Sequence, residues 1–570
     1  MSKGNGVDGQ RRHPGKGRRK GPRHLKGRQV DPAALGEVRD LLGDRPRRAD
    51  LLVEYLHLLQ DRYGHLSARH LAALAAEMRL AMAEVYEVAT FYHAFDVVKE
   101  DQTPPPPVTV RVCDSLVCEM LGGPELAAEL TAKLGDDVRV THGACMGRCE
   151  QGPVCSVGRT YIPNASAEDV AAAIAGTYRA PRDYETVGFD AYRAGGGYAL
   201  LVACLAGERT AEDVIEALEE SGLRGLGGAG FPAGRKWRFV RAEPGPRLMV
   251  VNADESEPGT FKDRYYLERD PHRFLEGMLI GAWAVEAEAV YIYLRTEYPE
   301  LHEIVGRALD DARAAGLIAP QVHIRRGAGA YICGEESAML ESIEGKRGLP
   351  RHKPPFPSQV GLFGRPTLIN NVETLYWVRD LIEKGHDWFT SAGRRGHRGW
   401  RSFSVSGRVK EPGVKFAPAG ITARELIDEY CGGMADGHGF KGYLPGGASG
   451  GILPARLAHL PLDFGTLEEY GCLIGSAAVV VLSDRDDASD AAVNLMRFFE
   501  DESCGQCTPC RAGTEKAVKL MRAKDWDEAL LSDLSACMMD ASICGLGQAA
   551  PNGLLSVFRY FPDDIPRRKP

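Results

Sequence analysis

The chain has 570 residues, of which 44% are hydrophobic and 26% are charged, and its formal net charge is −8. This length predicts several domains, and the composition is that of a globular protein. No run of about 18 apolar residues occurs, so we expect no membrane span, and the start of the chain lacks the apolar stretch of a secretory signal.

The chain begins with a strongly basic segment, residues 1–30. Its first 28 residues hold ten Lys or Arg and one Asp, a local charge of +9. This Gly-rich stretch predicts a disordered tail able to dock on an acidic partner, with an organellar transit peptide as the alternative. We expect no nucleic-acid binding, because the stretch has no aromatic side chain for base stacking.

Residues 31–100 are expected to form a helical domain. LLVEYLHLLQDRYG and LSARHLAALAAEM carry apolar residues at spacings of three and four, and Ser67 stands where an N-cap would. PPPP at 104–107 then enforces an extended linker. Residues 108–180 alternate strand and helix patterns, which predicts a small α/β domain of thioredoxin-like size.

Three further segments complete the predicted α/β multidomain fold. Residues 191–400 are the longest mixed block, with strand candidates RLMVVN, AVYIYL and VHIRR. Residues 401–480 read as short strands with one helix, TARELIDEY, and many glycine turns, as in a β-grasp domain. Residues 487–560 read mostly as helices.

The fourteen cysteines indicate metal binding, since no export signal favours a disulfide framework. Cys113 and Cys118 follow one predicted strand, and Cys145 and Cys149 follow the next. If the two strands are neighbours, four thiolates converge. Their spacings favour a [2Fe–2S] cluster, with zinc and a redox disulfide as alternatives.

A second cysteine set is evenly spaced in ESCGQCTPCRAG: Cys504, Cys507 and Cys510. Three thiolates on one turn need a fourth partner to hold a tetrahedral ion or a cubane cluster. Six scattered cysteines are expected to be buried small hydrophobes: Cys155, Cys204, Cys333, Cys431, Cys472 and Cys537.

SGLRGLGGAGFPAGRKW, residues 221–237, contains GLGGAG, which matches the dinucleotide fingerprint G-x-G-x-x-G. The match is weak, because that fingerprint needs a preceding strand and here a helical stretch, AEDVIEALEE, comes before it. The glycines instead predict a main chain that a planar ring or a phosphate can approach closely. Lys236 supplies a positive charge beside it.

Acidic and amide side chains follow several predicted strands. RLMVVN ends in Asn252 and is followed by Asp254, Glu255 and Glu257, which suit ribose or ribityl hydroxyls; a solvated acidic loop is the alternative. A glycine-rich turn in 325–345, KPPFP and INNVETL add further loops. Together these loops predict a nucleotide site.

These motifs resemble a known family. The chain resembles the NADH-binding flavoprotein subunit of respiratory complex I and its soluble relatives. The stretches that carry this resemblance are GLRGLGGAGFPAGRKW, VNADESEPGTFKDR, GAYICGEESAMLESIEGKRGLPRHKPPFP, LINNVETL, and ESCGQCTPCRAGT with ASICGLG. The C-x4-C and C-x3-C pairs look like the partner [2Fe–2S] subunit, here fused into the same chain. Within this family, the chain looks most similar to the β subunit of NAD-dependent, molybdenum- or tungsten-containing formate dehydrogenase. The stretches that carry this likeness are FDAYRAGGGYA, RSFSVSGRVKEPGVKFAPAG and ASICGLGQAAPN.

The resemblance implies a set of cofactor residues. The fourth ligand of a [4Fe–4S] cluster would be Cys544, in SICGLG, rather than Cys537. FMN would be held by Gly225, Gly227, Lys236, Asn252, Asp254, Glu255, Gly334, Glu335, Asn370 and Asn371. NAD(H) would be faced by Phe231, Lys236, Glu257, Tyr331, Glu336, Lys353 and Phe356.

The resemblance also implies a function that needs no general acid or nucleophile. Electrons would pass from the [4Fe–4S] cluster through FMN to NAD⁺ as hydride, with the [2Fe–2S] cluster as a side relay. The expected partner is the large molybdopterin subunit of a cytoplasmic formate dehydrogenase. The alternatives are the equivalent subunit of an NAD-reducing hydrogenase or of a complex I-like NADH dehydrogenase, and, from another class, a zinc-stabilised scaffold without redox activity.

Overall fold

A computed structural model describes residues 29–566. The predicted basic tail, residues 1–30, lies almost entirely outside the described residues. The first described elements are helices α1 (Pro32–Leu42), α2 (Leu52–Tyr63), α3 (Ala68–Met78) and α4 (Met82–Phe91), with short parallel strands β1 (Leu66–Ser67) and β2 (Val97–Val98). Ser67 caps α3, accepting a hydrogen bond from the His70 amide at 3.3 Å.

The next segment is a four-stranded sheet in the order β4-β3-β5-β6. Its elements are β3 (Val108–Cys113), α5 (Leu116–Met120), α6 (Gly123–Lys133), β4 (Val138–Gly143), β5 (Cys155–Val157), β6 (Thr160–Ile162) and α7 (Ala167–Ile174). Strands β3 and β4 are parallel neighbours. The two cysteine loops that follow these strands therefore leave the same edge of the sheet.

The central part is built on a parallel sheet in the order β10-β7-β8-β9. Its strands are β7 (Arg247–Ala253), β8 (Ala287–Leu294), β9 (Gln321–Arg326) and β10 (Thr367–Asn371). Its longer helices are α10 (Ala211–Ser221), α11 (Ala233–Ala242), α12 (Lys262–Arg269), α13 (Pro271–Ala284), α14 (Pro299–Ala314) and α15 (Glu336–Ile343). Shorter helices are α8 (Phe189–Ala194), α9 (Ala199–Leu205), α16 (Val372–Tyr376), α17 (Val378–Lys384) and α18 (His386–Thr390).

A five-stranded mixed sheet follows, in the order β12-β11-β15-β13-β14. Its strands are β11 (Trp400–Gly407), β12 (Gly413–Pro418), β13 (Phe440–Leu444), β14 (Leu453–Pro454) and β15 (Ala478–Ser483). The first strand, β11, is parallel to the last, β15, and each is flanked by an antiparallel neighbour, which is the β-grasp arrangement. The predicted helix TARELIDEY is one turn, α19 (Ala423–Glu425), continued by a π-helical turn over Leu426–Tyr430.

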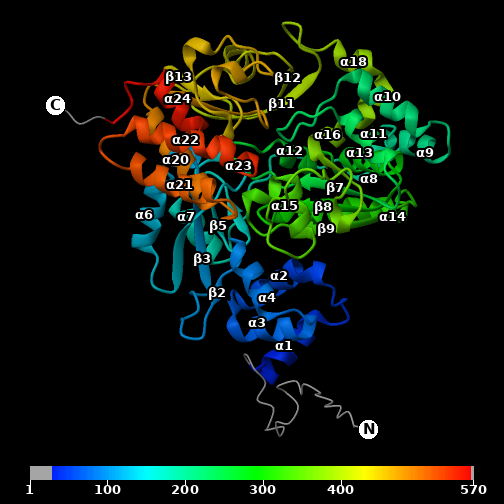
Figure 1. Ribbon diagram of the computed structural model, residues 1–570, viewed down its shortest axis with the longest axis horizontal. Helices are drawn as coiled ribbons and strands as arrows, with labels where there is room; N and C mark the ends of the chain where they lie inside the picture. The colour runs from blue at the N-terminus through cyan, green and yellow to red at the C-terminus, as the bar shows by residue number, and fades with distance from the viewer. Residues whose placement is uncertain (1–28, 567–570) are drawn as a thin grey trace, which may run out of the picture.

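The C-terminal part is helical: α20 (Ala488–Asp501), α21 (Thr508–Met521), α22 (Glu528–Ala541), α23 (Gly545–Ala549) and α24 (Asn552–Tyr560). Figure 1 shows these helices beside the β-grasp sheet, with the thioredoxin-like sheet below them and α1–α4 at the bottom. Within residues 29–566, no helix is both long and apolar enough to cross a membrane.

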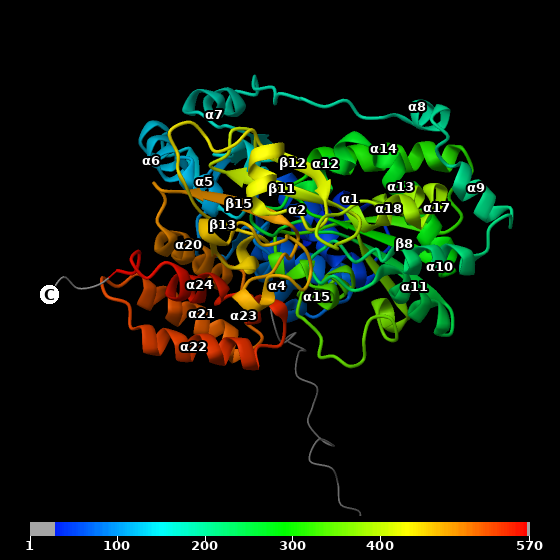
Figure 2. The ribbon, with the colours of Figure 1, turned by 90° about the horizontal axis from the view of Figure 1, so that it is seen from above.

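Several parts meet in one large apolar cluster, and an external strap also joins them. The largest buried cluster contains side chains from α1, from the central sheet, from β15 and from α20–α24. In Figure 2 the segment between α7 and α8 runs as an extended strap across the outside of the molecule. The end of this strap is held to α12 by the Val187 amide, 2.8 Å from the Arg269 carbonyl, and by the Thr186 hydroxyl, 2.7 Å from the Glu268 carbonyl.

Candidate functional site

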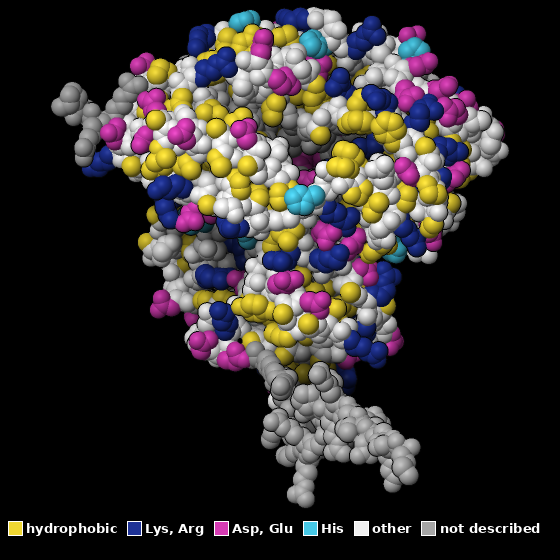
Figure 3. Space-filling model, in the orientation of Figure 1, with side chains coloured by type: hydrophobic (Ala, Val, Ile, Leu, Met, Phe, Trp, Pro, Cys, Tyr) yellow, Lys and Arg dark blue, Asp and Glu magenta, His cyan; other side chains and the backbone are white. Residues whose placement is uncertain are grey.

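A cavity of about 600 Å³ lies at the carboxyl ends of β7 and β10. This edge of a parallel sheet is where α/β proteins bind nucleotides. Figure 3 shows acidic side chains inside a hollow between the regions that Figure 1 labels α23 and α16. The cavity is lined by these residues predicted for FMN: Gly227, Asn252, Asp254, Glu255, Gly334, Glu335 and Asn371.

One wall of the cavity is the glycine loop between α10 and α11. An isolated bridge between Arg224 and Pro232 closes the base of this loop, and the Leu226 amide donates to the Thr374 hydroxyl at 2.9 Å. A Cβ added at Gly227 would lie 3.1 Å from the Asn371 Cβ, and Gly228 has a φ of +127°. The loop therefore presents bare main chain to the cavity, as a flat ring or a phosphate requires.

The opposite wall is acidic. Glu255 accepts hydrogen bonds from the amides of Asp263 at 2.7 Å and Arg264 at 3.0 Å, and from the Tyr298 hydroxyl at 3.1 Å. Burial raises the pKa of Glu255 and the pKa of Asp254 to about 8 each. Carboxyls that are protonated near neutral pH can donate as well as accept hydrogen bonds, so this wall suits hydroxyl-rich or heterocyclic ligands.

A buried cation lies under the acidic wall. The Lys262 ammonium is 2.9 Å from both the Asp263 and the Glu373 carboxylates, and Asn371 donates to Asp263 at 2.6 Å. Lys262 and Asp263 both line the cavity. Sequence reasoning did not single out Lys262, although it lies in the quoted stretch VNADESEPGTFKDR. Its partner Glu373 is more than a hundred residues away, so no local pattern marks the pair.

The β-grasp part contributes to the same cavity. Glu257 accepts hydrogen bonds from the Ser449 amide at 2.7 Å and the Ser449 hydroxyl at 2.8 Å, and the Tyr331 hydroxyl donates to its other oxygen. All three residues line the cavity. Burial raises the pKa of Glu257. Glu257 and Tyr331 were predicted for NAD(H), whereas Ser449 was not predicted because it is 192 residues from Glu257 in the chain.

The remaining predicted residues lie beside the cavity. Glu336 bridges two lysines, at 3.6 Å from the Lys236 ammonium and 2.7 Å from the Lys353 ammonium. Phe231 and Phe356 expose 40% and 51% of their surfaces, so both rings are free to stack on a ligand. Gly225 and Asn370 lie behind the cavity lining: the Gly225 amide donates to the Phe231 carbonyl at 2.8 Å, and Asn370 accepts from the Trp237 indole at 2.9 Å.

The second cysteine set borders the cavity. Cys507 is the N-cap of α21 and Cys544 is the N-cap of α23. Burial raises the pKa of Cys510 to about 11 and that of Cys544 to about 12, and the nearby Cys504 thiol contributes to both increases. A Cβ at Gly547 would lie 2.8 Å from the Cys510 Cβ, so only a glycine lets the Cys544 turn come this close.

Cys537 is different from the four thiols just described. It lies on α22 and is exposed, which corrects the prediction that it is a buried small hydrophobe. The other five scattered cysteines are buried as predicted. All fourteen cysteines lie within the described residues and are free thiols.

The first cysteine set is fully buried. The Cys145 and Cys149 sulfurs are 3.5 Å apart. Hydrogen bonds from Cys113 and Cys149 lower the pKa of Cys145, and hydrogen bonds to Cys118 and Cys145 raise the pKa of Cys113. All four sulfurs therefore converge, as the strand order predicted. Within residues 29–566, no group of three or more His, Cys, Asp or Glu side chains is placed so that it could hold a single metal ion.

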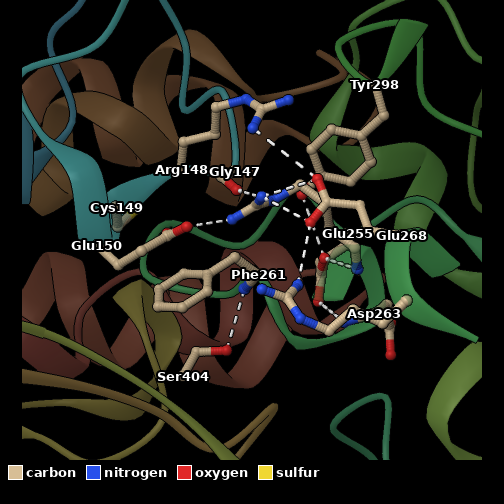
Figure 4. Close-up of polar contacts among 12 residues, drawn as sticks. Gly147, Arg148, Cys149, Glu150, Glu255, Phe261, Asp263, Glu268, Tyr298 and Ser404 are labelled. Atoms are coloured by element: carbon tan, nitrogen blue, oxygen red, sulfur yellow. Dashed lines mark hydrogen bonds and ion pairs between the residues drawn. The ribbon is translucent and has the colours of Figure 1, made fainter. Parts of the chain in front are cut away.

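Two buried arginines connect the first cysteine set to the acidic wall. Figure 4 shows the loop that carries Gly147, Cys149 and Glu150 facing Glu255 and Glu268. The Arg264 guanidinium donates to the Gly147 carbonyl at 3.0 Å and to Glu268 at 3.0 Å, and it pairs with Glu150. Arg295 donates to the Cys145 carbonyl at 2.6 Å and to the Glu255 carbonyl. The loop that carries Cys145 and Cys149 is thereby bonded to the segment that lines the cavity.

Three family models match the chain. They are the Nuo51 FMN-binding domain over residues 218–380, the thioredoxin-like [2Fe-2S] ferredoxin over residues 38–178, and the NADH-ubiquinone oxidoreductase-F iron-sulfur binding region over residues 490–568. The chain therefore contains an FMN-binding domain, a [2Fe–2S] domain and a [4Fe–4S] region. The glycine cradle, the raised-pKa carboxyls and the two thiol sets fit these groups chemically.

Curated relatives and solved structures agree with these matches. The chain is 43% identical over 386 residues to one of the two F subunits of NADH-quinone oxidoreductase in Rhizobium meliloti (strain 1021), an alignment that covers 65% of this chain and 91% of the relative. It is 40% identical over 390 residues to the F subunit of NADH-quinone oxidoreductase in Aquifex aeolicus (strain VF5), covering 66% and 90%. A crystal structure of NAD⁺-reducing [NiFe]-hydrogenase in the H2-reduced state aligns with a TM-score of 0.80 and 31% identity, covering 91% of this chain and 93% of that chain.

Proposed function

The chain belongs to the family of the F subunits of NADH-quinone oxidoreductase, and on that premise we propose that it is the NAD(H)-linked electron-transfer subunit of a formate dehydrogenase. In this role it passes electrons from iron–sulfur clusters through FMN to NAD⁺, reversibly. One observation carries the electron-transfer part of this proposal. The nucleotide cavity is lined by Gly545 and Leu546, the two residues that follow Cys544, so the cubane site and the flavin site share a wall.

FMN is held by the glycine loop, the acidic wall and the amides at the end of β10. Bound FMN exchanges electrons singly with clusters and in pairs, as hydride, with NAD(H). Gly227 offers bare main chain, while Asn252 and Asn371 offer amide donors from the cavity lining. Gly225, Lys236 and Asn370 support this wall from behind, where Lys236 donates to the Ile369 carbonyl at 3.2 Å.

NAD(H) enters over the exposed rim of the cavity. Phe231 and Phe356 stack on its rings, and Lys236, Glu336 and Lys353 form the polar edge beside them. Glu257, with Tyr331, faces the ribose. A carboxylate at that position repels a 2′-phosphate, so we propose a preference for NAD over NADP.

The thiol sets have separate roles. The [4Fe–4S] cluster would be held by Cys504, Cys507, Cys510 and Cys544, and it would pass electrons directly to the flavin site. The [2Fe–2S] cluster would be held by Cys113, Cys118, Cys145 and Cys149, and it would act as a side relay, off the direct path. The 3.5 Å separation of the Cys145 and Cys149 sulfurs, and the positions of Cys507 and Cys544 at the starts of two helices, support this division. No residue of the chain is assigned as a general acid or nucleophile for hydride transfer.

The partner is the large molybdopterin subunit, with molybdenum or tungsten, of the formate dehydrogenase. The stretches FDAYRAGGGYA and RSFSVSGRVKEPGVKFAPAG support this choice by resemblance. None of the fourteen cysteines forms a disulfide, which fits a reducing compartment, and we place the complex in the cytoplasm. A second candidate is the equivalent subunit of an NAD-reducing hydrogenase, favoured by the structural match over 91% of the chain.

Co-purification tests the choice of partner. The tagged chain, isolated under anaerobic conditions from cells that express its native partners, is expected to bring down a molybdopterin protein and to reduce NAD⁺ with formate. A nickel protein and hydrogen-dependent reduction would instead select the second candidate. For the chain alone, NADH-dependent reduction of ferricyanide is expected; a colourless protein that contains zinc without iron would reject any redox role.

A further inference from the structure

A second cavity, of about 810 Å³, lies on the other side of the acidic wall; we call it the outer cavity. Its lining comes from the N-terminal helices, the thioredoxin-like sheet, the central sheet and α20. Its rim is open to water, since the side chains of His142, Arg159 and His93 are 73%, 52% and 53% exposed. Its inner end is lined by the buried side chains of Arg295 and Cys145, each 2% exposed.

The outer cavity and the nucleotide cavity share a thin wall. Among the residues that the structure describes, Asp254, Ser256 and Tyr331 line both cavities. The Ser256 hydroxyl donates to the Asp254 carboxyl at 3.3 Å, and the Asp254 amide is fixed by the Asn252 side chain at 3.1 Å. Asp254 is thus held in place in the wall between the two cavities.

The proposed reaction consumes a proton. Its balance is NAD⁺ + 2e⁻ + H⁺ → NADH: the electrons come from the reduced clusters, and the proton must come from water. In the proposed binding mode NAD⁺ would cover the rim of the nucleotide cavity and would close that route to water. A proton therefore needs another path to the flavin site, and the outer cavity reaches the same wall from the solvent.

We propose that Asp254 carries this proton between the outer cavity and the nucleotide cavity. The inference rests on the proposed function, because it assigns a residue for that same reaction. In the direction of NADH oxidation the same carboxyl would pass a proton outward.

The surroundings of Asp254 suit a carrier. The groups that face it are Ser256, Tyr293, Arg295, Glu297, Cys333 and Glu502. Burial raises the pKa of Asp254 to about 8, with Glu297 and Glu502 adding to the increase and Arg295 opposing it. A group with a pKa near the working pH both holds and releases a proton readily. Burial raises the pKa of Tyr331 well above its ordinary value, so that hydroxyl does not release its proton at neutral pH.

The test uses the cofactor-loaded chain and its Asp254→Asn and Asp254→Glu variants. The protein is chemically reduced and mixed with NAD⁺ in weak buffer, and proton uptake is followed with an indicator dye in H₂O and in D₂O. We expect Asp254→Asn to slow proton uptake by at least about tenfold and to enlarge the solvent isotope effect. Asp254→Glu is expected to restore the rate, and millimolar acetate is expected to rescue Asp254→Asn. Asp501→Asn, which changes a carboxyl of the outer cavity alone, is the matched control.

Asp254→Asn could also slow proton uptake by losing FMN, so a second variant tests the proton path without changing Asp254. Ala94→Phe narrows the outer cavity at a residue that is assigned to no cofactor, and it is expected to slow proton uptake while flavin content and cluster spectra stay unchanged. Wild-type proton uptake in either Asp254→Asn or Ala94→Phe would overturn the proposal. If the wild-type chain itself fails to exchange electrons with NAD(H), the proposed function fails instead, so the two failures are distinguishable.

Discussion

Replacing Arg264 with methionine tests whether one buried charge holds the [2Fe–2S] loop against the flavin-binding part. Arg264 is 5% exposed, and its guanidinium bonds Gly147, Glu150 and Glu268. Removing one member of a buried ion network costs about 3–5 kcal/mol, because its partners remain buried and uncompensated. The Arg269 guanidinium, 3.4 Å from the Glu268 carboxylate, still compensates part of that charge. We therefore expect Arg264→Met to lower the free energy of unfolding by about 3 kcal/mol, near the lower end of this range.

Unfolding in guanidinium chloride, followed by circular dichroism and by the absorption of the [2Fe–2S] cluster, measures this loss. Arg264→Lys keeps the charge without the forked donors and should fall between wild type and Arg264→Met. Lys133→Met, which breaks an exposed pair with Glu129, should change stability by at most about 0.5 kcal/mol. A change below about 1 kcal/mol in Arg264→Met would refute the reasoning, because it would mean that the junction is hydrated.

Three further predictions concern the cofactor sites. Cys544→Ala should abolish the electron paramagnetic resonance signal of the [4Fe–4S] cluster, whereas Cys537→Ala should leave it intact; the reverse pattern would transfer the fourth ligand to Cys537. The folded FMN-free protein should lose stability as pH rises, because between about pH 4.5 and pH 8 the unfolded chain has released protons that Asp254 and Glu255 still hold when folded. Each carboxyl lowers the free energy of unfolding by up to about 1.4 kcal/mol per pH unit. Denaturant unfolding should therefore show that the free energy of unfolding falls less steeply with pH in Asp254→Asn than in the wild type. The same slope in both proteins would contradict the raised pKa of Asp254. Glu257→Gln should narrow the preference for NADH over NADPH by about tenfold in kcat/KM, and an unchanged ratio would remove Glu257 from the ribose site.

Local sequence patterns predicted most of the framework. The thioredoxin-like strands, the first three strands of the central sheet and the C-terminal helices follow from apolar periodicity and turn residues. Strand β10 was predicted only as a loop before a helix, because five residues between two turns give a weak pattern. The sequence motif also selected Cys544 over Cys537. Cys537 is exposed on α22 and Cys544 is only partly exposed, but the choice of the fourth ligand stays a prediction.

What the sequence could not predict depends on contacts between distant segments. Lys262 pairs with Glu373, Ser449 reaches Glu257, and Arg264 reaches Gly147, each across more than a hundred residues. The exposure of Cys537 likewise depends on which face of α22 is covered. The six-part division of the chain stays a prediction, because the largest apolar core runs through several of the proposed parts.

The strap between α7 and α8 has a consequence for how the electron path is assembled. Two separate proteins would meet only as often as their concentrations allow, and dilution would part them. A tether of this kind keeps the thioredoxin-like part near the central part at an effective concentration of the order of millimolar, whatever the amount of protein in the cell. The flavin-binding part and the [2Fe–2S] part are therefore always made in a one-to-one ratio, because one gene encodes both.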